Sequence, residues 1–410
     1  MLFLSRNSGT GGQTKADPED FVVEEITGKG VTLERDRRYS ASDLGENEVP
    51  EGRFTTFVLQ KRQWNTVQAV TSIAKALDHG KKSAGYAGTK DRNAVTVQLA
   101  SVFGATPDQV MALRIKDLAI NGAWRSNGVE MGSNIGNAFR IAISDAGKPE
   151  NAGETIDELN GKMPNYFDRQ RFGSRLNNAK IGLEIMRGNF ENATMLFLTD
   201  TTGERNQDAV EARKRLARER EFGDALAYFP RYLKNERYVL QHLGGNGRDY
   251  AGALRKLPRG ISLMFIHAVQ SLLFNLEVEN RIEERDFESG IWCRSNFYGF
   301  PESGVPIPEK SDFPLAPLIG YETKEEHMSD NGRESLEGLE LTKDSFKIKG
   351  MPELSMRGAF RPIIAPVKSL SAGVDGDRLL LSFSIPSGSY ATVMANEITK
   401  SDNFELGALA

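Results

Sequence analysis

The sequence predicts an α+β fold in which one domain is interrupted by another. Three features of the 410-residue chain point to this fold: the first third holds several short strand-like runs, the middle is rich in helical patterns and charge, and strand character returns near the end. Strands and helices grouped in this way are typical of α+β domains or of separate domains. A chain of this length can also bury more than one hydrophobic core.

Four β-branched or aromatic runs in the first third are expected to form strands. They are residues 21–26, 54–59, 94–99 and 139–143. A helix is expected between the second and third runs, because Asn65 has the side chain of an N-cap and apolar residues follow it at helical spacing. Gly80 is expected to end that helix. Its apolar positions are Val67, Val70, Ile73, Ala74 and Leu77.

The middle of the chain, from about residue 176 to residue 265, has helical spacing and many charged residues. Ser262 is expected to cap a long helix that continues through Ile282. Strand character returns at residues 379–385, and a further helix is expected to start near Ser387 or Ser389. The chain is expected to return to the first domain at residues 357–364. The acidic, Pro/Gly-rich residues 300–345 are expected to form an elaborated surface segment of the second domain.

Composition excludes several classes of protein. Apolar residues make up 39% and charged residues 26%, which fits a soluble globular protein. No apolar run approaches the roughly 18 residues that a membrane span needs. Cys293 is a lone cysteine, which rules out an internal disulfide and fits a reducing cytoplasm. The four histidines are far apart in the sequence, so we expect no metal site.

The net charge of −4 argues against a protein that binds nucleic acid. The distribution of charge weakens that argument, because acidic residues gather at 277–288 and 322–340 while basic residues form short clusters elsewhere. The clusters are Lys61 with Arg62, Lys81 with Lys82, Lys90 with Arg92, Arg169 and Arg171 with Arg175, and residues 213–220. The sequence is therefore still compatible with a local basic groove that binds nucleic acid on an otherwise acidic protein.

Residues 86–98 contain the densest set of reactive side chains. Asp91 lies between Lys90 and Arg92 at a junction between loop and strand, and the flexible pair Ala87-Gly88 precedes them. Neighbouring cations favour the ionised form of a carboxylate, which is what an anionic catalytic group or nucleophile requires at neutral pH. The alternative is a solvated charged turn, which is the commoner environment of an isolated Lys-Asp-Arg tripeptide.

Residues 165–173 place two arginines among aromatic residues and end in glycine. Aromatic rings can stack on splayed bases while arginines bind phosphates, as in proteins that bind single-stranded RNA. The alternative is that Tyr166, Phe167 and Phe172 pack into a core and the arginines pair with surface acids.

Two other patterns carry no such chemistry. Residues 8–15 look like a phosphate-binding loop, but they lack its Gly-Lys-Ser/Thr ending and no strand leads into them. Glu24 and Glu25 are adjacent on an expected strand, so they point to opposite faces and form a poor acid/base pair for glycoside hydrolysis.

Taken together, these segments resemble the TruD family of tRNA pseudouridine synthases. The similarity covers about the first 175 and the last 55 residues and is looser between them, mainly at residues 267–275. The matching segments follow the family's order along the chain. They are Lys15 with residues 18–25, residues 87–98, 136–139 and 165–173, and residues 386–397.

The resemblance implies a pseudouridine synthase catalytic domain with a mixed, largely antiparallel sheet, formed by residues 1–172 and 356–410. Residues 173–355 would form a helix-rich α+β insertion domain. The implied reaction is isomerisation of a uridine in tRNA, typically at position 13, and it needs no cofactor. A cytoplasmic monomer is expected, with tRNA as its partner and with neither a metal nor a membrane involved.

The resemblance also assigns roles to residues. Asp91 matches the family's catalytic aspartate, Lys15 its basic partner, and Asn137 the polar neighbour of an aromatic residue, Phe139, that stacks on the target uracil. Phe139 is expected at the mouth of its strand, where the preceding small residues let a ligand approach. The other expected substrate contacts are Phe21, Glu25, Lys90, Arg92, Arg169, Arg171, Phe172 and Tyr390, the last at a position where other members can carry Phe.

Two other functions stay open. The first is a non-catalytic tRNA-binding protein of the same fold, against which the intact Asp91, Lys15 and Phe139 argue. The second is a glycosidase that acts on small nucleosides, which would leave the basic and aromatic residues 165–173 and the large insertion without a purpose.

Overall fold

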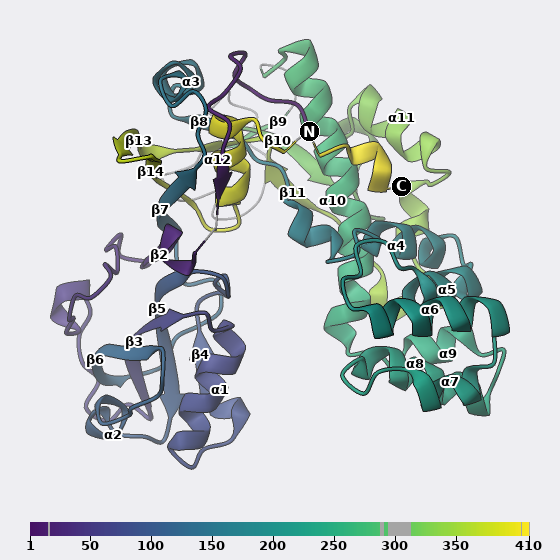
Figure 1. The fold of residues 1–410 in the computed structure, drawn as a ribbon, viewed down its shortest axis with the longest axis horizontal. Helices are drawn as coiled ribbons and strands as arrows, with labels where there is room; N and C mark the ends of the chain where they lie inside the picture. The colour runs from purple at the N-terminus through teal and green to yellow at the C-terminus, as the bar shows by residue number, and fades with distance from the viewer. Residues whose placement is uncertain (15–16, 288–290, 294–312, 403, 410) are drawn as a thin grey trace.

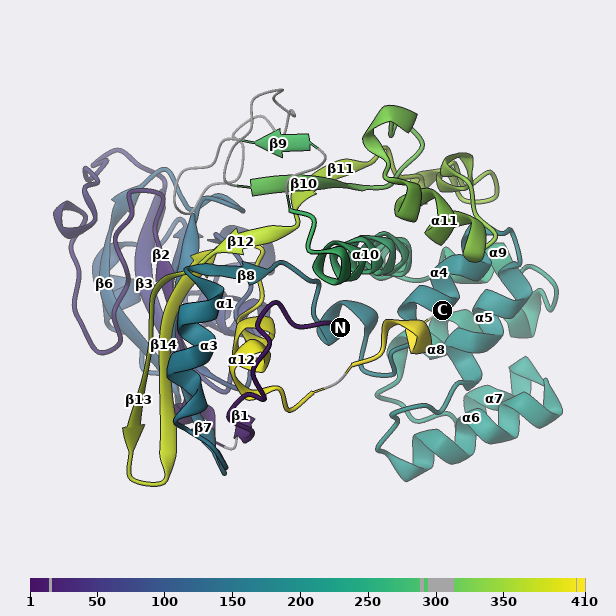
Figure 2. The ribbon, with the colours of Figure 1, turned by 90° about the horizontal axis from the view of Figure 1, so that it is seen from above.

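The computed structural model describes residues 1–14, 17–287, 291–293, 313–402 and 404–409 (Figure 1). A large sheet occupies one lobe and helices α4 to α9 occupy another, with α10 between them (Figures 1 and 2). The fold is α+β, as the sequence predicts, because strands from both ends of the chain share one sheet.

The large sheet has nine strands in the order β13-β14-β7-β2-β5-β3-β6, with β1 added to β7 and β4 to β5. Among the described residues β2 and β5 pair in parallel, and the other neighbours in this sheet pair antiparallel. The strands are β1 (Gln13–Thr14), β2 (Phe21–Ile26), β3 (Phe54–Arg62), β4 (Ala84–Tyr86), β5 (Val95–Phe103), β6 (Leu118–Ser126), β7 (Gly136–Ser144), β13 (Lys368–Asp375) and β14 (Arg378–Pro386). The mixed, largely antiparallel sheet is therefore confirmed.

Helices cover one face of this sheet. α1 (Thr66–Ala76) packs Val70 and Ile73 against β3 and β5, and its N-cap Asn65 accepts a hydrogen bond from the backbone amide of Val67. α12 (Ala391–Thr399) packs over β7 and β14 in a second apolar cluster. Two further helices, α2 (Pro107–Met111) and α3 (Asn151–Leu159), belong to the same lobe.

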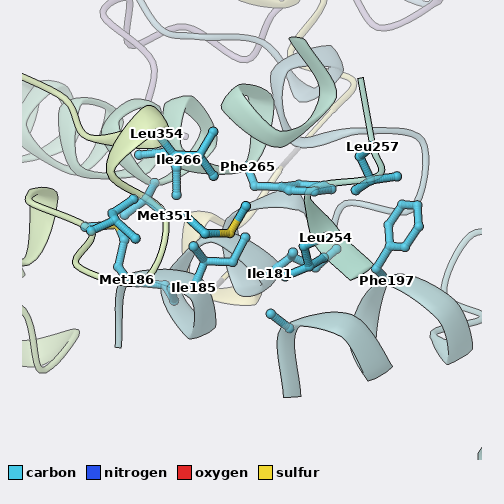
Figure 3. Close-up of a cluster of buried hydrophobic side chains, with 14 of the residues drawn as sticks. Ile181, Ile185, Met186, Phe197, Leu254, Leu257, Phe265, Ile266, Met351 and Leu354 are labelled. Carbon is cyan, nitrogen blue, oxygen red and sulfur yellow. The ribbon is translucent and has the colours of Figure 1, made fainter. Parts of the chain in front are cut away.

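The helical lobe has its own apolar core (Figure 3). Its helices are α4 (Asn178–Met186), α5 (Phe190–Thr199), α6 (Gln207–Glu219), α7 (Phe222–Tyr228), α8 (Lys234–Gly245), α9 (Tyr250–Leu254), α10 (Arg259–Glu284) and α11 (Asp330–Gly338). Two small sheets lie near α10. They pair β8 (Lys162–Pro164) with β12 (Ile364–Pro366), and β10 (Phe313–Leu318) with β9 (Ile291–Cys293) and β11 (Ala359–Pro362).

α10 joins the two cores. Phe265 and Ile266 near its start pack in the helical core, whereas Phe274 and Val278 pack with the large sheet. By length and composition it is the one helix of the described chain that could cross a membrane, but 72% of its most apolar window is buried inside the structure. That burial is what a core helix of a globular protein shows.

Several predicted boundaries are wrong by a few residues. α10 begins at Arg259 after the N-cap Pro258, so Ser262 is buried inside the helix and does not cap it. The last long helix begins at Ala391 with Tyr390 as its N-cap, later than predicted. α1 ends at Ala76, before Gly80. Residues 300–312, which are part of the predicted acidic surface segment, lie outside the described residues.

Candidate active site

The register of the large sheet brings several polar side chains to one face. Residues that pair across strands point to the same face, and the direction alternates along each strand. Asn137 of β7 pairs with Glu25 of β2, and Thr96 of β5 pairs with Lys61 of β3. Because Val23 of β2 pairs with both Thr96 and Phe139, all of these side chains share the face that α1 and α12 cover.

The loop before β5, which carries Asp91, is fixed to this face by side chains. Gln98 donates to the carbonyl oxygen of Gly88 at 3.0 Å, and the hydroxyl of Thr66 accepts from the backbone amide of Lys90 at 2.9 Å. The Thr66 hydroxyl in turn donates to Gln98 at 3.0 Å. The loop therefore has a defined conformation, with Asp91 partly exposed and Arg92 exposed.

Lys61 holds the backbone of Asp91 itself. Its side chain is fully buried, and its ammonium group donates to the carbonyl oxygens of Trp64 and Asp91 at 2.7 and 2.9 Å. Burial lowers the pKa of Lys61 to about 8, against an opposing effect of the Asp91 charge. In the sequence Lys61 is conspicuous only as part of a basic pair with Arg62. Its inward position in a strand rich in apolar residues was the signal that could have found it.

Lys90 and Glu25 form a buried ion pair beside this loop. The Lys90 ammonium lies 2.6 Å from a Glu25 oxygen, with the side chains 5% and 0% exposed. The other Glu25 oxygen accepts from the backbone amide of Leu99 at 2.9 Å. The expected contact of these two residues with substrate stays a prediction; in this structure both charged groups are satisfied within the protein and shielded from solvent.

Asn137 and Phe139 project from β7 next to that pair. The side-chain oxygen of Asn137 is buried and has no hydrogen-bond partner among the described residues. Phe139 is 7% exposed; its ring stacks on Phe383 at 5.3 Å and meets the edge of Phe21 at 6.0 Å. β7 begins at Gly136, so Phe139 lies inside the strand and the predicted place at the strand's mouth is wrong.

Phe21 and Phe172 are also not accessible to a substrate in this structure. Phe21 is 1% exposed beneath Phe139, and Phe172 is fully buried against Phe404. For residues 165–173 the packing alternative is correct for the aromatic rings, because Tyr166 and Phe167 are only 2% and 4% exposed.

The two arginines of that segment have different surroundings. Arg169 forms an exposed ion pair with Asp402 at 3.0 Å and lies over the Phe404 ring. The Arg171 guanidinium lies 4.9 Å from the ring centre of Phe167. Phe167 also meets the ring of Tyr390 edge to face at 6.2 Å, so Tyr390 borders this segment.

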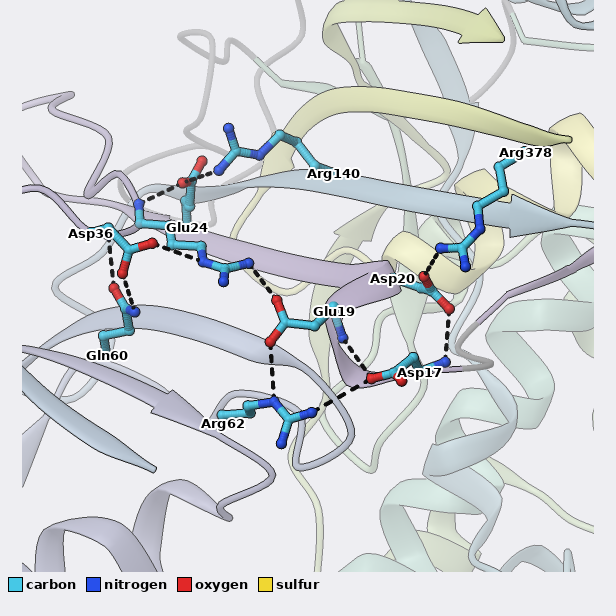
Figure 4. A network of polar contacts seen from close by, with 10 residues as sticks. Asp17, Glu19, Asp20, Glu24, Asp36, Gln60, Arg62, Arg140 and Arg378 are labelled. Carbon is cyan, nitrogen blue, oxygen red and sulfur yellow. Dashed lines mark hydrogen bonds and ion pairs between the residues drawn. The ribbon is translucent and has the colours of Figure 1, made fainter. Parts of the chain in front are cut away.

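The start of β2 is fixed by charges on the opposite side of the sheet (Figure 4). Asp17 and Asp20 form a capping box around the turn Pro18–Asp20. Arg62 binds Glu19 at 3.0 Å, and Arg378 binds Asp20 at 2.7 Å. Lys15, the predicted partner of Asp91, lies just before this turn and outside the described residues, so its role stays a prediction.

The residues that the structure describes hold no group of three or more His, Cys, Asp or Glu side chains that could bind a metal ion. The chemical groups at this face are instead the carboxylate of Asp91, whose backbone is held by Lys61, and the buried ammonium groups of Lys61 and Lys90. The side-chain oxygen of Asn137, which has no hydrogen-bond partner among the described residues, lies there too.

Comparison with known proteins gives one consistent result. The family model for tRNA pseudouridine synthase D (TruD) matches residues 1–292 and 301–398. A probable tRNA pseudouridine synthase D of Methanosarcina acetivorans is 31% identical, over 99% of this chain and 96% of the relative. One from Pyrococcus abyssi is 32% identical, over 98% of this chain and 99% of the relative. The crystal structure of a putative tRNA pseudouridine synthase D from Methanosarcina mazei has a TM-score of 0.77 and 30% identity, and covers 98% of this chain and 96% of its own.

Proposed function

The chain belongs to the tRNA pseudouridine synthase D (TruD) family, and we propose that Asp91 is the carboxylate with which it isomerises a uridine of tRNA to pseudouridine. The isomerisation breaks the N1–C1′ glycosidic bond, turns the uracil and joins C5 to C1′. The C5 proton leaves and N1 gains a proton, so the net composition is unchanged and no redox partner is needed.

The observation that carries this assignment is the way in which Asp91 is held. Its backbone is bound by Lys61, and the adjacent residues of its loop are bound by Thr66, Gln98 and Glu25. A catalytic group must be held near its productive geometry by neighbours that are themselves fixed. The carboxylate held in this way can act on C1′, on the base or on the 2′ proton.

Other residues complete the proposed site. The unpartnered oxygen of Asn137 is available to accept a hydrogen bond from an N–H of the turning base. Arg92, exposed beside Asp91, is positioned to bind a phosphate next to the target nucleotide. Tyr390, which is partly exposed and meets the ring of Phe167, is the further aromatic residue of the proposed site. The target base must leave its stack to reach these groups, at a cost of roughly a few kcal/mol.

The remaining expectations belong to the same proposal. The target is uridine 13 of tRNA, and the protein acts as a monomer in the cytoplasm without a metal. Residues 1–172 and 356–410 form the catalytic domain and residues 173–355 the insertion domain. The separate apolar core of the helical lobe supports this division.

The test is release of tritium from tRNA labelled at C5 of its uridines, followed by mapping of pseudouridine in the product. The wild type should release tritium, and Asp91→Asn, which keeps the size but removes the anion, should release none while it still binds tRNA. A matched control is Asp36→Asn, which alters an exposed carboxylate on the opposite side of the sheet. Pseudouridine formed by Asp91→Asn at a rate near that of the wild type would remove Asp91 from the proposed role.

A further inference from the structure

A pocket of about 240 Å³ opens where the sheet lobe meets the helical lobe. It is lined by Arg171 and Phe167 from the end of the first catalytic segment, by His267 of α10, and by Arg357 before β11. None of the described residues that line it is acidic. Two arginines beside a histidine, with no carboxylate among the described lining residues, favour a ligand that is an anion.

Arg171 has a donor that the protein does not use. Its Nε is buried and has no hydrogen-bond partner among the described residues. The guanidinium also carries two terminal NH2 groups, and a guanidinium binds phosphate oxygens with a favourable geometry.

The Phe167 ring, over which the Arg171 guanidinium lies, is held in place by its neighbours. The Phe167 backbone donates to and accepts from the side chain of Asn275, with both distances 2.8 Å. The partly buried guanidinium of Arg361 lies 4.2 Å from the ring centre of Phe167 and donates to the side-chain oxygen of Asn165 at 2.7 Å. Phe167 therefore cannot turn easily, and it fixes the position at which Arg171 faces the pocket.

The other two basic residues differ in their environment. Burial, and then the charge of Arg171, lower the pKa of His267, so its imidazole is neutral at pH 7 and can donate one N–H. The Arg357 side chain is 77% exposed and lies 3.7 Å from Glu322, which is a long ion pair. Such an exposed pair contributes little and can open to bind another anion.

We propose that this pocket binds one phosphodiester group of the tRNA substrate. This inference rests on the proposed function, because it takes tRNA as the substrate. Arg171 lies where the chain leaves the catalytic segment and Arg357 where it returns, with His267 on the helix that joins the two cores. The phosphate therefore contacts both lobes at once. Since Phe167 also meets Tyr390, the pocket lies one aromatic ring away from a residue placed in the site.

The test measures tRNA affinity at several salt concentrations for Arg357→Gln, Arg171→Gln and Arg171→Lys. Each phosphate that is neutralised contributes about 0.7–0.9 to the slope of log K against log salt. Both Gln variants should lose a slope of this size and bind several-fold more weakly at low salt, whereas Arg171→Lys should keep the slope. The matched control is Arg220→Gln, because Arg220 is 61% exposed and paired with Glu191 and does not line the pocket.

Two results separate the failure of this site from the failure of the proposed function. If the wild type forms no pseudouridine in tRNA, the proposed function is wrong and the site falls with it. If the wild type is active but Arg357→Gln keeps the wild-type salt slope, the pocket does not bind a phosphate. Because Arg357 is exposed, this variant decides the matter even if Arg171→Gln fails to fold.

Discussion

The ammonium group of Lys61 lies 2.9 Å from the backbone carbonyl oxygen of Asp91, so a buried lysine of β3 fixes the main chain of the proposed catalytic residue. A second carbonyl, that of Trp64, takes another of its donors at 2.7 Å. Lys61 thus joins the end of β3 to the loop before β5. It is a positioning residue, because its hydrogen bond reaches the backbone of Asp91.

Lys61→Met should lower turnover more than tRNA affinity. The change keeps most of the side-chain volume but leaves two buried carbonyls without a donor, and a displacement of about 1 Å at a catalytic group can cost about 100-fold in rate. We expect kcat to fall by about 10- to 100-fold with KM nearly unchanged. Single-turnover rates at saturating tRNA measure this, with Lys75→Met on the exposed side of α1 as control. A rise in KM alone would make Lys61 a contact to RNA.

The lowered pKa of Lys61 predicts how stability depends on pH. The pKa is about 8 in the folded protein and 10.5 in the unfolded chain, so between these values the unfolded chain binds more protons. The contribution of Lys61 to the free energy of unfolding therefore rises with pH in this window, and the penalty of its burial is complete below pH 8. The full change is on the order of 3 kcal/mol.

Chemical denaturation of the wild type and Lys61→Met from pH 7.5 to 10 tests this expectation. The difference in free energy of unfolding should move in favour of the wild type as pH rises. A difference that stays constant with pH would show that Lys61 has an ordinary pKa in the folded protein.

Glu25→Gln should destabilise the protein. It leaves the Lys90 ammonium, only 5% exposed, without its carboxylate, and breaking a buried ion pair in this way costs about 3–5 kcal/mol. The double variant Glu25→Gln with Lys90→Met should recover part of the loss, because no unpaired charge is then buried. Asp402→Asn is the control: it breaks the exposed pair with Arg169 and should cost at most about 1 kcal/mol. Equal losses in the two single variants would contradict the assignment of a buried pair.

The sequence predicts strands that are rich in β-branched and aromatic residues or that bury alternate apolar residues, and it misses weaker patterns. β2 is found because β-branched and aromatic residues follow a turn, and β14 because its buried apolar residues alternate along the strand. β13 is missed because it is an edge strand with mostly exposed polar residues. β6 is missed because Gly122 interrupts it, at a point where a side chain would collide with the carbonyl oxygen of Tyr39.

The same limit applies to the site. Asp91 is found from a local motif, but Lys61 and Thr66 bind its loop through pairing between distant strands and the start of α1, which no local pattern encodes. Burial is likewise not encoded locally. The family resemblance implies substrate contacts at Glu25 and Phe172, whereas their neighbours in space bury both side chains in this structure.

Phe139 is the residue at which packing and recognition can be separated most clearly. It is 7% exposed between Phe21 and Phe383, so packing alone predicts that Phe139→Ala costs about 3–5 kcal/mol of folding stability. If Phe139 also stacks on the uracil, the folded fraction of the same variant should lose about 1–3 kcal/mol of base stabilisation. That loss corresponds to roughly one to two decades in rate.

Turnover and melting temperature must therefore be measured on the same Phe139→Ala sample. Phe383→Ala is the matched control, since it removes the stacked neighbour from the same cluster but is not expected to touch the base. Stacking on the uracil predicts similar losses of melting temperature in the two variants but a lower rate per folded molecule in Phe139→Ala alone. Full activity in the folded fraction of Phe139→Ala would make this ring a part of the core and leave the recognition of the base to Asn137 and Tyr390.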